Sequence, residues 1–244
     1  QNYRSVTFND IRITNPSLTV DPNITDEKGF TADIGARGRI NSYLKYDVGV
    51  FFLNYENRLG VILREVSDIE TERFRSNIGD AITYGVESFI DWNIWETFSA
   101  NEDYKLSSFL NLSIIDSEYT DSQQNNVEGN SVEFIPDVNL KTGLKFGYRD
   151  FLGSLQYTYL GTQFTDATNS RRDFESQSGI IGEIPAYDIV DLSLSYSFNY
   201  FKIEAGINNV LDKSYFVRRA TGYPGPGIIP SQPRTYYATL QIKL

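Results

Sequence analysis

The side chains best suited to chemistry in this chain are arginines in long polar segments. A guanidinium group presents its N–H donors as a fixed fork that matches a carboxylate with two parallel hydrogen bonds. Arginines in loops are therefore candidates for binding an anionic ligand, and a tyrosine ring nearby could stack on it. The candidate ligand-binding residues are Arg171, Arg172, Arg218, Arg219, Tyr223 and Arg234, with Arg73 and Arg75 as further candidates.

Several kinds of chemistry are excluded by composition. The chain has no His and no Cys, so a Ser-His-Asp triad, a His-ligated zinc site and a disulfide are unavailable. The acidic residues form no catalytic constellation, and we expect neither enzymatic activity nor a cofactor. Residues 121–137 have a composition suited to Ca²⁺ but no recognisable ligand spacing, so no metal site is assigned. The net charge of −10 argues against a nucleic-acid partner.

The elements that must position these arginines are strands, as residues 235–244 illustrate. Every second residue from Tyr236 to Leu244 is apolar, and those between are polar apart from Tyr237. This period of two predicts a β-strand with one apolar and one polar face. Ten residues is also about the length that a tilted strand needs to cross the hydrocarbon of a bilayer. No run of eighteen apolar residues predicts a transmembrane helix.

The same alternation recurs along the chain, and short turns alternate with long polar loops between the strands. A membrane barrel has short periplasmic turns and long extracellular loops, and its aromatic girdles suit the 17 Tyr and 16 Phe. The sequence therefore predicts an all-β, transmembrane antiparallel β-barrel. Residues 1–8 are too short to judge, 9–29 are loop-like, and 59–63 could extend the preceding strand. Strands are expected at 30–40, 44–52, 84–94, 110–114, 140–148, 155–159, 190–198, 203–207 and 235–244, and long loops at 57–81, 121–137, 166–186 and 212–234.

Nine is an odd number of strands, whereas bacterial single-chain barrels of this kind are even-numbered. An open sheet would leave two unpaired edges in hydrocarbon, which is unfavourable. No signal peptide opens the chain, and Gln1 is not an initiator Met. We therefore expect residues 1–244 to be the C-terminal portion of a larger barrel.

One segment carries a family resemblance. Residues 206–215, Gly-Ile-Asn-Asn-Val-Leu-Asp-Lys-Ser-Tyr, resemble the penultimate strand and its exit in TonB-dependent outer-membrane receptors. Residues 218–230 and Arg234 resemble the last extracellular loop of the ferric-citrate branch of that family. Asn15-Pro16 with the strand at 32–38, and Pro136-Asp137 before the strand at 140–148, also fit. Physically, Asn208 and Asn209 can satisfy backbone groups where strand pairing ends, and Asp212 begins the loop.

The resemblance implies a 22-stranded barrel with an N-terminal plug, whose plug domain and N-terminal strands are absent from this chain. It implies a receptor in the cell outer membrane of a Gram-negative bacterium that takes up a ferric chelate, such as ferric citrate or another siderophore. The implied partners are TonB through an absent N-terminal segment, outer-membrane lipid, lipopolysaccharide and the barrel-assembly machinery. The family usually ends on Phe, whereas Leu244 stands at this position.

Other functions and other roles of the arginines remain open at this point. The barrel could be a passive porin or a structural subunit of an envelope complex, and the chain could also be a soluble β-rich adhesion or glycan-binding module. The arginines could form loop ion pairs with Asp173 and Glu175 or contact lipopolysaccharide phosphates.

Overall fold

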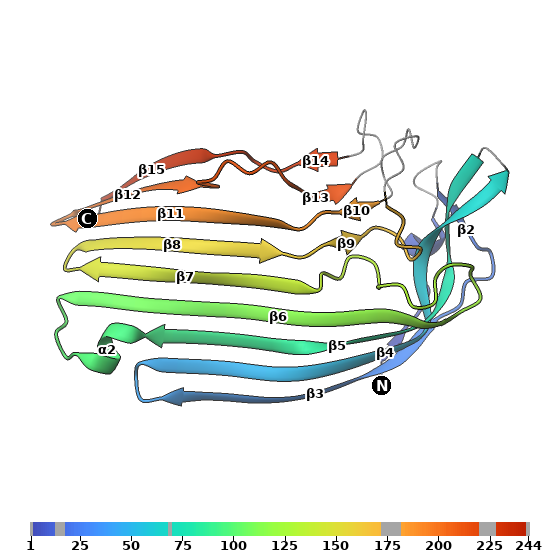
Figure 1. Cartoon of the computed structure of the whole chain (residues 1–244), viewed down its shortest axis with the longest axis horizontal. Helices are drawn as coiled ribbons and strands as arrows, with labels where there is room; N and C mark the ends of the chain where they lie inside the picture. The colour runs from blue at the N-terminus through green and yellow to red at the C-terminus, as the bar shows by residue number, and fades with distance from the viewer. Residues whose placement is uncertain (1, 13–17, 68–69, 172–181, 220–227, 243–244) are drawn as a thin grey trace.

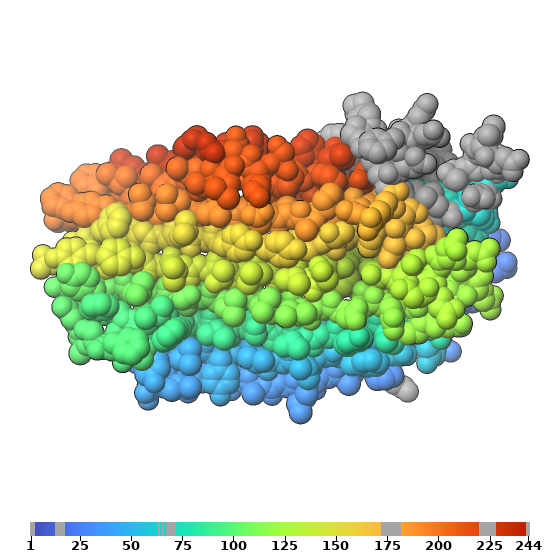
Figure 2. Space-filling view, viewed as in Figure 1, coloured from blue at the N-terminus to red at the C-terminus, as the bar shows by residue number. Residues whose placement is uncertain are grey.

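The computed structural model describes residues 2–12, 18–67, 70–171, 182–219 and 228–242. Most of them belong to one sheet in which each long strand pairs antiparallel with its neighbours in sequence (Figure 1). Figure 2 shows the same order as consecutive bands of colour across the molecule. The long strands are β3 (Glu27–Ile40), β4 (Leu44–Ser67), β5 (Glu70–Asn93), β6 (Tyr104–Ser122), β7 (Val138–Tyr148), β8 (Phe151–Leu160), β11 (Tyr187–Phe198), β12 (Phe201–Asn208) and β15 (Thr235–Ile242).

These strands confirm the nine that the alternation predicts, in the same order. The tight turns are also confirmed: Asn41, Arg149 and Asn199 stand between successive strands with φ of 50°, 49° and 49°. Asn adopts this left-handed conformation more readily than most residues. All the tight turns lie at one end of the sheet and the long loops at the other (Figure 1).

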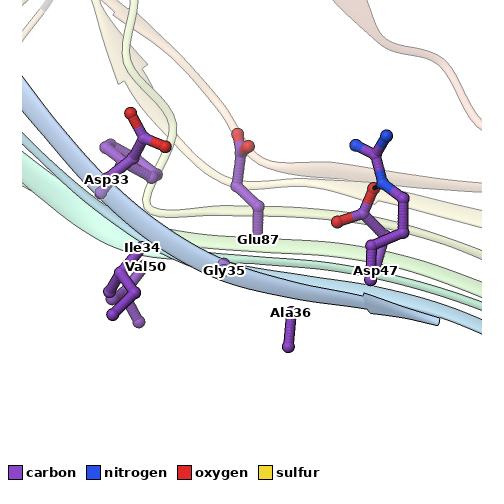
Figure 3. Close-up of a pocket in the computed structure, with 10 residues that line it drawn as sticks. Asp33, Ile34, Gly35, Ala36, Asp47, Val50 and Glu87 are labelled. Atoms are coloured by element: carbon purple, nitrogen blue, oxygen red, sulfur yellow. Dashed lines mark hydrogen bonds and ion pairs between the residues drawn. The ribbon is translucent and has the colours of Figure 1, made fainter.

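The two faces of the sheet differ in polarity because, away from the register shifts at 55–59, 65–67 and 80–81, paired residues on neighbouring strands keep to the same face. Leu194 lies opposite Gly153 and Ala205, whereas the preceding residue, Ser193, lies opposite Ser154 and Gly206. The same alternation appears where β3, β4 and β5 meet. Figure 3 shows acidic side chains on one side of the ribbon and Ile34, Ala36 and Val50 on the other. The polar side carries a hollow of about 520 Å³ over Gly35 and Gly49, lined by Asp33, Arg37, Asp47 and Glu87.

This polarity identifies the two faces of a barrel wall. Large apolar side chains such as Ile34, Leu194 and Leu240 are exposed on one face. On the other face Arg37 Nε lies 2.7 Å from Asp47 Oδ2. In a membrane barrel the apolar face contacts lipid and the polar face lines the interior. We call them the outward face and the inner face.

The predicted loop at 57–81 is wrong as a loop, because strand pairing continues through it. β4 and β5 are 24 residues each and pair as far as Ser67 and Glu70. Register shifts between Tyr55 and Leu59 interrupt the ladder, and the hairpin bends away from the other strands beyond them (Figure 1). Its charges predict a loop, but Arg64 and Glu72 form an ion pair across the two strands. The expected extension at 59–63 is confirmed.

Short elements complete the fold. Residues 1–8, which are too short to judge from the sequence, contain β1 (Asn2–Arg4), which pairs with β3. Residues 9–29, expected to be loop-like, include β2 (Leu18–Val20), which is parallel to β5. Neither α1 (Phe8–Ile11) nor α2 (Ile94–Phe98) is predicted by the alternation. No helix in the described ranges is long and apolar enough to cross a membrane. The predicted loops at 166–186 and 212–234 contain short strands. β10 (Glu183–Ile184) pairs with β9 (Gln163–Phe164), which lies just before the first of these loops, and β13 (Phe216–Arg219) pairs with β14 (Ile228–Pro230) inside the second.

Candidate functional site

The long-loop end of the molecule contains a buried core. Backbone bonds tie its segments together, since Ala167 N donates to Val61 O at 3.1 Å and Phe134 N to Phe164 O at 2.9 Å. Tyr119 lies opposite Ala81, in the row of inner-face residues that includes Thr83. The extended hairpin and two loops therefore pack together over the inner face. We call this assembly the loop core; its buried apolar members are Ile62, Ile78, Ala81, Tyr119, Val127, Val132 and Ala167.

A closed polar network lies inside the loop core. Arg58 Nη1 donates to Tyr119 OH at 2.8 Å and to Glu133 Oε1 at 3.0 Å, and Tyr119 OH donates to Glu133 Oε2 at 2.7 Å. Gly60 leaves room for it, because a Cβ there would lie 2.7 Å from Glu133 Oε1. The network joins β4, β6 and the loop after β6 through one ion pair.

The environment fixes the charges of this network. Burial lowers the pKa of Arg58, but Glu133 and Tyr119 more than offset it, so the pKa stays above its ordinary value. Burial and the neighbouring Glu133 both raise the pKa of the Tyr119 hydroxyl. Arg58 is therefore a cation and Tyr119 a neutral donor at all physiological pH values.

Two further buried polar groups in the loop core, on Asp166 and Arg73, are incompletely satisfied. Asp166 is 0% exposed, and its Oδ1 accepts from Thr168 N at 3.0 Å. Its Oδ2, like the buried Nε of Arg73, has no hydrogen-bond partner among the described residues. Burial raises the pKa of Asp166 and outweighs the hydrogen bonds from Thr168, which lower it. Burial also lowers the pKa of Arg73.

Arg73 and Arg75 are thus placed in packing contacts. The Arg73 Nε is buried, whereas Arg75 Nη1 donates to the carbonyl oxygens of Asn9 at 3.0 Å and Asp10 at 3.1 Å. Arg75 therefore holds α1 against the hairpin.

Two of the predicted site residues meet at one glutamate. Arg171 Nε lies 3.6 Å from Glu183 Oε2. Arg219 donates from Nε at 3.1 Å and from Nη2 at 2.9 Å to the backbone oxygen of Glu183. A pocket of about 300 Å³ beside them is lined by Arg171, Glu183, Asp116, Ser117 and Thr162, among others. Loops far apart in sequence therefore place Arg171 and Arg219 together.

The remaining predicted residues are dispersed or lie outside the description. Arg218 is exposed on β13, and Arg234 is exposed just before β15, where its backbone N donates to Asp212 Oδ1 at 2.9 Å. Arg172 and Tyr223 lie outside the described residues, as do Asp173 and Glu175. Within the described ranges, no three His, Cys, Asp or Glu side chains gather closely enough to hold a metal ion.

The Asn-Asn-Val-Leu-Asp-Lys segment performs the structural role predicted for it. Asn209 has φ of 53°, its Nδ2 donates to Lys213 O at 2.8 Å, and its Oδ1 accepts from Lys213 N at 2.9 Å. Asn208 Nδ2 also donates to Thr235 Oγ1 at 3.2 Å. Beyond this turn, Tyr215 stacks on Tyr187 with ring centroids 4.5 Å apart. The motif therefore closes β12 and aims the chain toward β13 and its arginines.

Sequence reasoning missed Glu183, Arg58 and Glu133. Glu183 is one acid in a loop rich in charged and polar residues, and nothing local distinguishes it. Arg58 and Glu133 are 75 residues apart and meet only where β4 packs against the loop after β6. The one usable signal was Gly60 within the apolar run at 59–63, because a Gly inside a strand is typical of a close approach by another segment.

Comparison with known proteins identifies the family. The family described as "TonB dependent receptor-like, beta-barrel" matches residues 1–210. No curated protein sequence matches. Among solved structures, the unliganded ferric citrate transporter FecA matches with a TM-score of 0.70 and 22% identity over 89% of this chain and 31% of that one. The copper transporter OprC matches with a TM-score of 0.69 and 15% identity over 98% of this chain and 35% of that one.

The ferric yersiniabactin uptake receptor FyuA from Yersinia pestis gives a TM-score of 0.66 and 19% identity over 90% of this chain and 30% of that one. At these identities the likeness shows the fold. The chain spans about a third of the length of these structures. The family match covers most of the 244 residues and agrees with the paired strands, the two faces and the alternating turns and loops. The chain belongs to the TonB-dependent receptor-like β-barrel family.

Proposed function

We propose that residues 1–244 are the C-terminal part of a TonB-dependent outer-membrane transporter that takes up an iron chelate, such as ferric citrate or another siderophore. The observation that carries the proposal is the family match over residues 1–210. An N-terminal plug and further strands that complete a 22-stranded barrel would precede this segment, and TonB would bind ahead of the plug. The outward face would contact the lipid of a Gram-negative outer membrane, and the loops lipopolysaccharide. The barrel-assembly machinery would insert the barrel.

The loop core supports a receptor over a passive porin. It packs over the inner face at the long-loop end, where an open pore needs free passage. Its buried ion pair gives the loops a defined arrangement, which suits capture of a specific ligand.

The substrate class rests on the arginines. A ferric carboxylate is anionic and offers carboxylate edges to guanidinium forks. Arg171 is 84% exposed, and its 3.6 Å contact with Glu183 is a weak surface ion pair. Arg171 can therefore turn to a ligand, whereas Arg219 is held by the Glu183 carbonyl. Arg172, Arg218, Tyr223 and Arg234 complete the proposed binding set.

A binding measurement tests this site. We expect Arg171→Ala with Arg219→Ala to weaken ferric-citrate binding to the purified full-length receptor by at least tenfold. A hydrogen bond to a charged group contributes roughly 1.5–3 kcal/mol, and 1.4 kcal/mol is about tenfold in affinity. Arg149→Ala, in a tight turn at the opposite end of the sheet, is the control and should bind as the parent does. Unchanged binding by the double variant would remove both arginines from the site.

A further inference from the structure

The connection between β5 and β6 carries an exposed aromatic helix at the tight-turn end (Figure 1). α2 has the sequence Ile-Trp-Glu-Thr-Phe, and its last residue, Phe98, is 79% exposed. A Phe side chain left in water forgoes a large part of its favourable transfer free energy. The other apolar residues of the helix, Ile94 and Trp95, are only partly exposed.

Contacts with the strands place α2 on the outward side of the sheet. Trp92 Nε1 donates to Thr97 Oγ1 at 2.9 Å, and Trp92 is opposite Leu44 on the outward face. The Trp95 ring lies 5.2 Å from that of Tyr104, which lies 4.8 Å from that of Tyr148. Tyr104 and Tyr148 are register partners on the same face. The helix therefore continues the surface that the strands present to lipid.

The polar groups of this connection are satisfied within it. Asn93 Nδ2 donates to Glu96 Oε2 at 2.7 Å, and Trp95 Nε1 donates to Asn101 O at 2.7 Å. Ser99 N closes the helix by donating to Trp95 O at 2.9 Å. The helix is thus held in place by its own connection and by the strand ends, and its apolar side can meet a hydrophobic phase without burying an unpaired donor.

We propose that α2 is an interfacial anchor that inserts Phe98, with Trp95 beside it, at the boundary between headgroups and acyl chains of the periplasmic leaflet. The proposal rests on the proposed membrane location. Aromatic side chains favour this boundary because their rings are apolar and their polar edges can stay hydrated. Residues 94–103 contain Glu96, Glu102 and Asp103 and no Lys or Arg. The lipid that fits is therefore zwitterionic, since an anionic surface would repel Glu96 and Glu102, whereas Asp103 is paired with Arg149.

Spin-label accessibility tests the proposal. The 244 residues contain no Cys, so Phe98→Cys in the full-length receptor gives one label site once any Cys outside this segment is replaced by Ser. The labelled protein is reconstituted into phosphatidylcholine bilayers, and accessibility to oxygen, which partitions into lipid, is compared with that to a water-soluble nickel complex. Leu194→Cys serves as the mid-strand outward control and Glu128→Cys as the exposed loop control.

We expect the oxygen-to-nickel ratio at position 98 to lie between the two controls and several-fold above that at position 128. A ratio at 98 equal to that at 128, with position 194 lipid-exposed, would overturn the anchor and leave the barrel proposal intact. Low accessibility to both reagents at 98 would also overturn it, because α2 would then be covered by protein. Nickel access at 194 would overturn the membrane location and the anchor together.

Discussion

At the scale of residues, the loop core depends on a few buried charges that stabilise one another. Arg58, Tyr119 and Glu133 come from separate segments and satisfy each other at 2.7–3.0 Å. Burying such charges is unfavourable unless they are paired, so the network acts as a constraint on how the loops fold together. Removal of one partner should therefore have a much larger effect than removal of a surface charge.

We expect Arg58→Ala to destabilise the loop core by about 3–5 kcal/mol, because it leaves the Glu133 carboxylate buried without its cation. Tyr119→Phe should cost about 1 kcal/mol, since the ion pair remains. The measurement is hydrogen exchange of residues 127–135. Arg149→Ala, which removes an exposed ion pair 3.5 Å long with Asp103, should leave those amides unchanged. Equal protection in Arg58→Ala and the parent would contradict this role of the network.

Asp166 makes the loop core sensitive to pH in a defined direction. Burial raises its pKa in the folded state. The protonated form is then favoured on folding, so its stabilising contribution is present below the ordinary pKa of about 3.9 and is lost as pH rises through the raised value. Amide protection around residues 165–168, corrected for intrinsic exchange, should fall over that window in the parent and stay level in Asp166→Asn. The exposed control Asp121→Asn should behave like the parent, and an identical pH profile in Asp166→Asn would exclude Asp166 as the cause.

At the scale of elements, strands and tight turns were predictable because both depend on the local sequence. Side-chain alternation indicates where a strand lies and which face each residue is on. A residue such as Asn199 or Arg149 between two alternating runs indicates a turn. The extended β4–β5 hairpin was not predictable, because a run of charged residues is typical of a loop. Only the structure shows that Arg64 and Glu72 are partners across the two strands. α2 was not predicted for another reason, since five residues are too few to show a helical period.

Close backbone approach at the β5–β6 pair gives an element-scale prediction. A Cβ at Gly79 would lie 2.0 Å from the Asp121 carbonyl oxygen, beside the register shift at Asp80. Gly79→Ala should therefore destabilise this end of the pair by roughly 1–3 kcal/mol through overpacking. At Gly49 the nearest atom would be 3.5 Å away, so Gly49→Ala is the control and should be neutral. Hydrogen exchange of residues 79–83 and 117–122 measures the effect of both variants. Unchanged amide protection in Gly79→Ala would show that the strands can separate here without loss of stability.

At the scale of the whole molecule, the two faces of the sheet and the clustering of long loops at one end define a barrel wall. The sequence predicts this architecture and the candidate arginines. It could not predict that Arg171 and Arg219 meet at Glu183, or that Arg75 is engaged with α1, because these contacts depend on how distant loops pack. Local patterns determine strands, whereas the site depends on contacts between segments tens of residues apart.

The most direct test of the proposed transport is uptake of radioactive iron, supplied as ferric citrate or another ferric siderophore, by cells that make the full-length receptor. We predict uptake that saturates with chelate concentration and is lost both when the receptor is deleted and when TonB is absent. The TonB-deficient strain separates energised transport from diffusion through a pore. Uptake that rises linearly with concentration and is equal with and without TonB would contradict the proposal and indicate a passive porin.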